Sequence, residues 1–100
     1  MKKIVLLCAA GMSTSLLVTK MQAAADKSGF ACEIRAYGVA QAPTVIPEAD
    51  VVLLGPQVKY TLAKFQKEYA DKKIAAIDMR VYGMVDGEKA LEQAKTIMEC

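Results

Sequence analysis

The sequence has 100 residues, of which 54% are hydrophobic, and a formal net charge of +2. This length fits a single domain with one core, and this hydrophobic share excludes a disordered chain. The near-neutral charge argues against a nucleic-acid binder, and the absence of histidine excludes histidine-based phosphoryl, proton or metal chemistry on this chain.

Short apolar runs alternate with amphipathic stretches in the first half of the chain. Residues 4–8 are apolar and precede a cluster of small residues, which predicts a strand buried on both faces. Residues 13–27 carry apolar side chains at helical spacing and end before a glycine, which predicts a helix. Residues 31–37 alternate between apolar and polar, as a half-exposed edge strand does. Residues 39–47 contain two prolines and predict a short helix or turn.

The second half repeats this alternation. Residues 51–54 predict another fully buried strand. Pro56 fits the first position of a helix that we expect to continue to about residue 69. A short fourth strand is expected over residues 74–78, and Asp86 is expected to cap the last helix.

The order of these elements predicts an α/β fold. Strands that alternate with helices form a parallel sheet with right-handed crossovers. Since the two most apolar strands belong in the middle, we expect a four-stranded sheet of order 2-1-3-4. The whole chain, residues 1–100, would then be one three-layer sandwich of the flavodoxin- or phosphatase-like type. In such a sheet the ligand crevice lies beyond the carboxyl ends of the strands, here between the first and the third.

Cys8 ends the first predicted strand and is therefore expected at this crevice. The segment that follows it can curl so that its N–H groups point inward, because it consists of small and flexible residues. That segment is Ala9, Ala10, Gly11, Met12, Ser13, Thr14 and Ser15. The last three are candidate N-caps of the first helix, whose N-terminus favours a thiolate and can hold phosphoryl oxygens. The other reading of Cys8 is a small, inert core residue.

A cysteine phosphatase loop offers the nearest chemical comparison. Such a loop has an arginine six positions after the cysteine, where this chain has Thr14, and the first arginine is Arg35. Without the guanidinium we expect poor hydrolysis and a phosphoryl group that persists, which favours a carrier. A hydrolase, a regulatory domain that binds a partner, and a thiol redox protein remain as alternatives.

The segment from Cys8 to Ser15 resembles the phosphorylation loop of IIB components in the lactose/cellobiose branch of the bacterial sugar phosphotransferase system. The similarity continues over residues 50–60 and 82–87. It implies that Cys8 accepts a phosphoryl group from a phosphohistidine on a IIA protein. Phosphocysteine would then pass the group to a β-disaccharide or β-glucoside in the membrane component IIC. The resemblance also implies a backbone cradle from Ala9 to Ser15, and a cytoplasmic monomer without cofactor or metal.

The three cysteines form no CxxC pair and no zinc-binding spacing, and their wide separation suits a reducing compartment. Cys32 is expected to point inward from its edge strand. Cys100 is expected to be exposed and without a role. No apolar run reaches the ~18 residues of a transmembrane helix.

Four residues of the second half are further candidates near the crevice. Asp78 and Arg80 follow the fourth predicted strand, where they could border a docking face for IIA or IIC. A turn residue and a solvated charge are the simpler interpretation. Tyr60 and Tyr82 could cover the rim of the crevice, although packing against the core is the preferred prediction. Residues 38–48 suggest no role, and the sequence does not identify the sugar.

Overall fold

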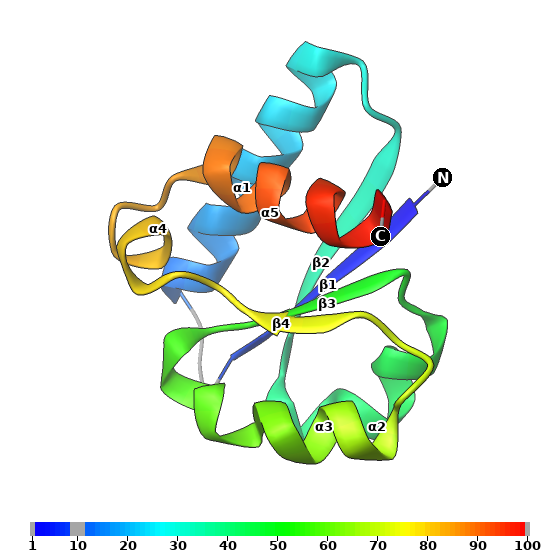
Figure 1. Cartoon of the computed structure of the whole chain (residues 1–100). Helices are drawn as coiled ribbons and strands as arrows, with labels where there is room; N and C mark the ends of the chain where they lie inside the picture. The colour runs from blue at the N-terminus through cyan, green and yellow to red at the C-terminus, as the bar shows by residue number, and fades with distance from the viewer. Residues whose placement is uncertain (1, 9–11, 100) are drawn as a thin grey trace.

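The computed structural model describes residues 2–8 and 12–99. Four parallel strands form one sheet in the order β2-β1-β3-β4 (Figure 1). Their bounds are β1 (Lys2–Cys8), β2 (Cys32–Gly38), β3 (Val51–Leu54) and β4 (Ile74–Ala76). The predicted strand order is confirmed, with the two most apolar strands in the middle and the alternating strand at an edge.

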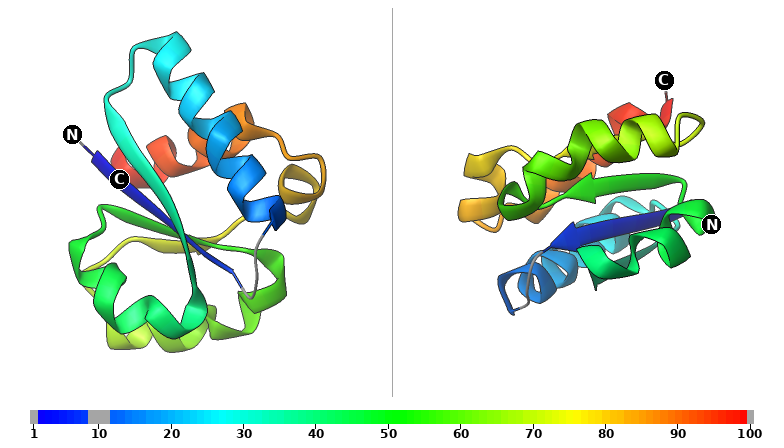
Figure 2. Two further views of the ribbon diagram at one scale, coloured as in Figure 1. Left: turned by 180° about the vertical axis from the view of Figure 1, so that it is seen from behind. Right: turned by 90° about the horizontal axis from the view of Figure 1, so that it is seen from below.

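Helices cover both faces of this sheet and make the predicted three layers (Figures 1 and 2). On one face lie α1 (Met12–Ser28) and α5 (Gly87–Glu99), and on the other lie α2 (Ala42–Val45) and α3 (Leu62–Glu68). Two 3-10 turns, η1 (Val39–Gln41) and η2 (Ile46–Glu48), flank α2. The short helix or turn predicted over residues 39–47 is therefore confirmed.

Side chains of β1 alternate between two cores. Ile4, Leu6 and Cys8 belong to the core under α1 and α5, whereas Val5 and Leu7 belong to the core over α2 and α3. This follows from the two-residue period of a strand, which sends successive side chains to opposite faces. The sulfur of Cys8 consequently faces the layer that contains α1.

The prediction of one continuous helix over residues 56–69 is wrong. The chain first forms the 3-10 segment η3 (Pro56–Thr61) and only then α3. The backbone of Val58 is non-helical, with φ −117° and ψ 19°. The Thr61 hydroxyl donates a hydrogen bond of 2.6 Å to the Val58 carbonyl, which closes a tighter turn there. The inner face is as predicted, because Val58 and Phe65 are buried.

The region after β4 also differs from the prediction. The strand ends at Ala76 instead of residue 78, and a short helix, α4 (Met79–Gly83), follows. Asp78 caps this helix: its Oδ1 accepts hydrogen bonds from the Arg80 and Val81 amides at 2.9 and 3.3 Å. Asp78 is thus a helix cap where a turn residue was predicted, and Arg80 is an exposed charge as expected.

The predicted N-caps of α5 and α1 have different outcomes. Asp86 caps α5 as predicted, since its Oδ1 accepts a hydrogen bond from the Lys89 amide at 3.1 Å. In contrast, α1 already begins at Met12, so Ser13, Thr14 and Ser15 stand inside the helix and none of them is its N-cap. Within the described residues, no helix is long and apolar enough to cross a membrane.

Candidate functional site

Cys8 is the last residue of β1, between the two neighbouring strands of the sheet. It pairs in register with Gly38 at the end of β2, while the preceding Leu7 pairs with Leu54 at the end of β3. Its side chain is only 2% exposed. The thiol therefore lies at the carboxyl end of the sheet.

The turn after β3 packs directly on the sulfur of Cys8. Gly55 anchors this turn, because its amide donates a hydrogen bond of 2.8 Å to the Leu7 carbonyl. A Cβ atom built on Gly55 would lie 2.9 Å from Cys8 Sγ and 2.6 Å from Gln57 Oε1. The backbone at Gly55 is extended, with φ −63° and ψ 153°, which any residue can adopt. Glycine is needed there for space and not for conformation.

Gly38, at the end of β2, has open space around it where Gly55 has none. Its backbone, with φ −72° and ψ 152°, resembles that of Gly55. A Cβ atom there would meet nothing within 4 Å. Among the described residues, close glycine packing on the sulfur is therefore confined to the side of β3.

Only residues 12–15 of the predicted phosphoryl cradle lie within the described residues. Ala9, Ala10 and Gly11 lie outside the described residues. Met12, Ser13, Thr14 and Ser15 form the first turn of α1, so they belong to a helix N-terminus and not to a loop. The first backbone N–H groups of a helix have no partner within it, and the helix dipole is positive at that end. A 17-residue helix thus begins four residues after Cys8.

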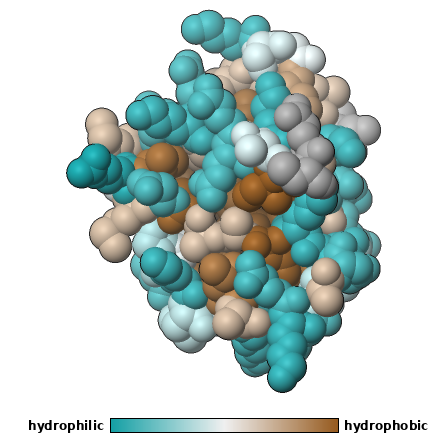
Figure 3. Space-filling view, viewed as in Figure 1, coloured by the Kyte–Doolittle hydropathy of each residue, from teal (hydrophilic) through white to brown (hydrophobic). Residues whose placement is uncertain are grey.

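Large apolar side chains are exposed at this same end of the sheet. Among the described residues there are four: Leu16 (49% exposed), Tyr60 (79%), Met79 (75%) and Met84 (77%). Leu16 follows β1 and Tyr60 follows β3, whereas Met79 begins α4 and Met84 directly follows it, both after β4. Figure 3 shows moderately hydrophobic side chains projecting beside hydrophilic ones at the left edge, where Figure 1 places α4. We call these four residues the apolar rim.

The two tyrosine predictions have different outcomes. Packing against the core is confirmed for Tyr82, which is buried among the residues under α1 and α5. It is wrong for Tyr60, which lies in η3 with its side chain in solvent. Tyr60 is two residues after the buried Val58, so it lies on the opposite side of the turn, which faces solvent.

Charges at this end leave two cations without an acidic partner. Lys59 and Arg80 are exposed, and neither takes part in an ion pair within the described part of the chain. The acids nearby, Asp78 and Asp86, both accept hydrogen bonds from helix N-termini. The carboxyl end therefore presents unpaired positive charge beside the apolar rim.

Cys32, as predicted, points into the core from the first position of β2, at the opposite end of the sheet. Burial raises the pKa of its thiol, and the nearby Asp26 adds to this effect. Cys100 lies outside the described residues. Over residues 2–8 and 12–99, no group of three cysteine, aspartate or glutamate residues could hold a metal ion.

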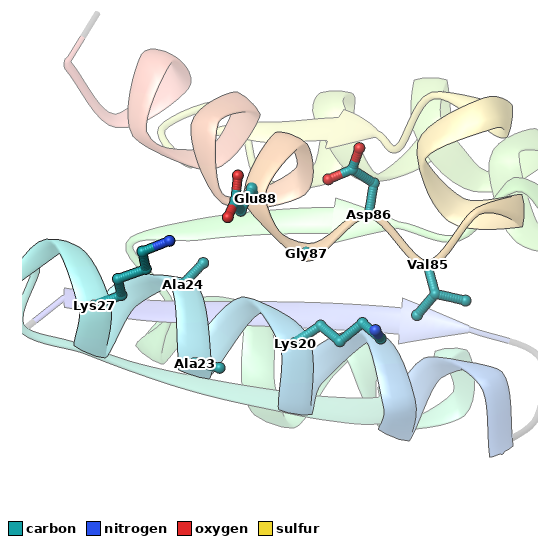
Figure 4. A pocket seen from close by; sticks show the side chains of 8 residues that line it. All are labelled: Lys20, Ala23, Ala24, Lys27, Val85, Asp86, Gly87 and Glu88. Atoms are coloured by element: carbon teal, nitrogen blue, oxygen red, sulfur yellow. The ribbon is translucent and has the colours of Figure 1, made fainter.

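A separate hollow of about 330 Å³ lies between α1 and the start of α5 (Figure 4). Lys20 and Lys27 line it from α1, and Asp86 and Glu88 line it from the opposite wall. Gly87 forms part of its floor, and a Cβ atom there would overlap the backbone of Lys20. The hollow lies between two helices, and none of its lining residues is next to Cys8.

The model of one protein family, described as "PTS system, Lactose/Cellobiose specific IIB subunit", matches residues 3–93. The chain is 50% identical over 101 residues to the PTS system oligo-beta-mannoside-specific EIIB component of Bacillus subtilis (strain 168), covering 98% of this chain and 97% of the relative. It is 46% identical over 104 residues to the PTS system galactose-specific EIIB component of Lactococcus lactis subsp. cremoris (strain MG1363), covering 97% and 96%.

A solved structure has the same fold. The solution structure of a cellobiose-specific phosphotransferase IIB component from Borrelia burgdorferi superimposes with a TM-score of 0.81 at 31% identity, covering 98% of this chain and 92% of that chain. The chain belongs to the lactose/cellobiose-specific IIB family of the sugar phosphotransferase system. It is therefore a phosphotransferase component of sugar uptake.

Proposed function

We propose that Cys8 carries a phosphoryl group from a phosphohistidine on a IIA protein to a sugar bound by a membrane component IIC. The observation that supports this most is the place of the thiol. It ends the central strand β1, α1 begins four residues later, and the turn at Gly55 packs so close to the sulfur that position 55 has no room for a Cβ atom. A helix N-terminus next to a nucleophile can stabilise the negative charge of a transferred phosphoryl group.

The transfer balances without a cofactor. The sulfur of Cys8 forms a bond to phosphorus while the bond between phosphorus and the donor's imidazole nitrogen breaks. The electron pair of that bond stays on the nitrogen, which takes up the proton that the thiol gives away. In the second step a sugar hydroxyl oxygen attacks phosphorus, the sulfur–phosphorus bond breaks, and the hydroxyl proton replaces the one lost from sulfur.

The residue six positions after Cys8 favours a carrier over a hydrolase. A phosphatase uses an arginine at that position to stabilise the transition state in two hydrogen bonds. Here it is Thr14. Phosphocysteine should therefore persist until an acceptor arrives, and transfer to water should be slow.

The apolar rim supports a protein partner at this end. Exposed apolar patches on a small domain mark sites of association, and the rim residues come from the segments after β1, β3 and β4. We propose that IIA docks there in its phosphorylated form, because unpaired Lys59 and Arg80 would suit an anionic partner. IIC would follow on the same end once IIA has left, with the chain a monomer in the cytoplasm.

The sugar is proposed only as a class. The named relatives carry three descriptions, oligo-beta-mannoside, galactose and cellobiose. We propose a β-linked disaccharide or β-glucoside, whose binding site would lie on IIC. Uptake assays in cells that carry this chain with each candidate IIC would identify it.

One experiment tests the proposal directly. The protein is incubated with phosphorylated IIA, and mass spectrometry counts the phosphoryl groups. We expect one group on the wild-type protein and none on Cys8→Ser, whereas Cys32→Ser, the matched buried thiol, and Cys100→Ser should keep it. An adduct that survives in Cys8→Ser would contradict the proposal. Release of phosphate from p-nitrophenyl phosphate that depends on Cys8 would favour a hydrolase instead.

A further inference from the structure

The side chain of Gln57 lies next to the sulfur of Cys8. Both Gln57 Oε1 and Cys8 Sγ are within 3.0 Å of the same point, the position of a Cβ atom on Gly55. The two atoms are therefore separated by less than the sum of the 2.6 Å and 2.9 Å distances. This places a carboxamide within reach of a group bonded to the sulfur.

Within the described part of the chain, the Gln57 carboxamide has no hydrogen-bond partner. Gln57 is exposed, and it makes no hydrogen bond among residues 2–8 and 12–99. By contrast, Gln22, Gln66 and Gln93 each donate a hydrogen bond to a backbone carbonyl. Gln57 is thus held beside the thiol by its place in η3 and not by a partner of its own.

Gly55 makes this approach possible. Any larger residue would put its Cβ atom less than 3.0 Å from both the carboxamide oxygen and the sulfur. The extended backbone of Gly55 does not itself require glycine. Glycine at this position therefore lets the carboxamide and the sulfur both lie against the turn.

We infer that Gln57 is a catalytic residue for phosphoryl transfer, donating a hydrogen bond from its amide nitrogen to a phosphoryl oxygen on Cys8. A carboxamide carries two N–H donors next to its oxygen, and rotation about its last torsion presents either side to the sulfur. Being neutral, it stabilises the phosphoryl group less than an arginine would. This suits a carrier, which has to release the group again. The inference rests on the proposed role of Cys8.

The test measures the rate of phosphoryl transfer from phosphorylated IIA to Cys8 as the IIA concentration is varied. Gln57→Ala should lower kcat about tenfold, the loss expected for one hydrogen bond to a charged group, and change KM for IIA less than twofold. Gln57→Glu should be slower still, because a carboxylate repels the phosphoryl oxygens. The ³¹P chemical shift of phosphocysteine should move in both variants, which a purely structural role would not cause.

Gln41→Ala is the matched control, since Gln41 is also an exposed glutamine without a hydrogen bond among the described residues. It should react at the wild-type rate. Wild-type kcat and an unchanged ³¹P shift in Gln57→Ala would overturn the inference, and so would a Gln57→Glu protein as fast as wild type. Absence of any adduct on the wild-type protein would instead overturn the proposed role of Cys8.

Discussion

The two ends of the sheet each hold a buried thiol, and the two thiols have different surroundings. Cys8 closes β1 at the carboxyl end, and Cys32 opens the neighbouring strand β2 at the amino end. Their side chains are 2% and 6% exposed, so burial does not distinguish them. Their surroundings differ instead. A helix N-terminus, a close glycine turn and exposed apolar side chains occur near Cys8, whereas Cys32 is packed as a core residue.

The direction of the strands therefore decides which of two buried thiols lies beside the turns and helix starts at the carboxyl edge. In a parallel sheet all carboxyl ends lie together, so the turns and helix starts that follow them gather at one edge. Gly55, the start of α1 and the four residues of the apolar rim all belong to such segments. Cys32 has no access to that edge, although it is on the strand next to Cys8.

The largest effect is expected from filling the space above Cys8. Gly55→Val places side-chain atoms where a Cβ atom alone would be 2.9 Å from the sulfur. We expect the rate of phosphoryl transfer from IIA to fall at least about a hundredfold, because a displacement of about 1 Å at a reacting centre costs that much. Quenched-flow measurement of the mass adduct gives the rate.

Gly38→Val is the matched control for this change, since its backbone is equally extended and a Cβ atom there meets nothing within 4 Å. It should transfer phosphate within about threefold of wild type, with thermal melting confirming that both variants fold. Equal rates in the two valine variants would show that the β3 side has no special part in the site.

A smaller effect should follow when the apolar rim is made polar. Met79→Ser with Met84→Ser removes two side chains that are 75% and 77% exposed. We expect KM for phosphorylated IIA to rise about tenfold with kcat unchanged, because interface anchors contribute to binding and not to the chemical step. Stability should hardly change, since neither side chain is part of the core.

Two charge reversals test the docking site further: Arg80→Glu is the test variant, and Lys67→Glu is its matched control. Arg80→Glu should raise KM for IIA, and this rise should grow at low salt, whereas Lys67→Glu on α3 should not. An unchanged KM in both the double serine variant and Arg80→Glu would mean that IIA docks elsewhere.

The smallest effect is expected at Cys32 and concerns stability alone. Burial raises the pKa of this thiol above 9.0 in the folded protein, so the folded state keeps a proton that the unfolded state loses at high pH. Its contribution to stability is full below about pH 9 and is lost as the pH rises through the folded pKa. Cys32→Ser should therefore lose less of its melting temperature between pH 7 and pH 10 than wild type. An equal or steeper loss would contradict the raised pKa.

Most of the fold follows from apolar patterning. The strand order, the two buried central strands and the two helix layers were predicted, because each depends on runs of apolar residues that are long enough to read. Helix α4 was missed because Met79–Gly83 forms little more than one turn, too short for a helical period. Asp78 alone does not distinguish a helix cap from a turn, since aspartate favours both.

The position of Cys8 at the end of a central strand was predictable, but its neighbours in space were not. The place of Cys8 at a strand end can be derived from the sequence, whereas the contact of Gly55 with its sulfur joins residues from different strands. No local pattern encodes that contact, because the Gly55-Pro56 pair predicts a turn and a helix start but not what the turn packs against. The kink at Val58 likewise depends on the hydrogen bond of Thr61.

The packing of α5 on α1 has a consequence for the folding of a chain made from its N-terminus. Gly87 sits against the backbone of Lys20, and Ala90, Leu91 and Ala94 share a core with Leu17 and Met21. Cys8 and α1 precede α5 in the chain, so α1 is synthesised before the helix that it packs against. We therefore expect the surroundings of Cys8 to become stable in a nascent chain only after α5 has emerged from the ribosome.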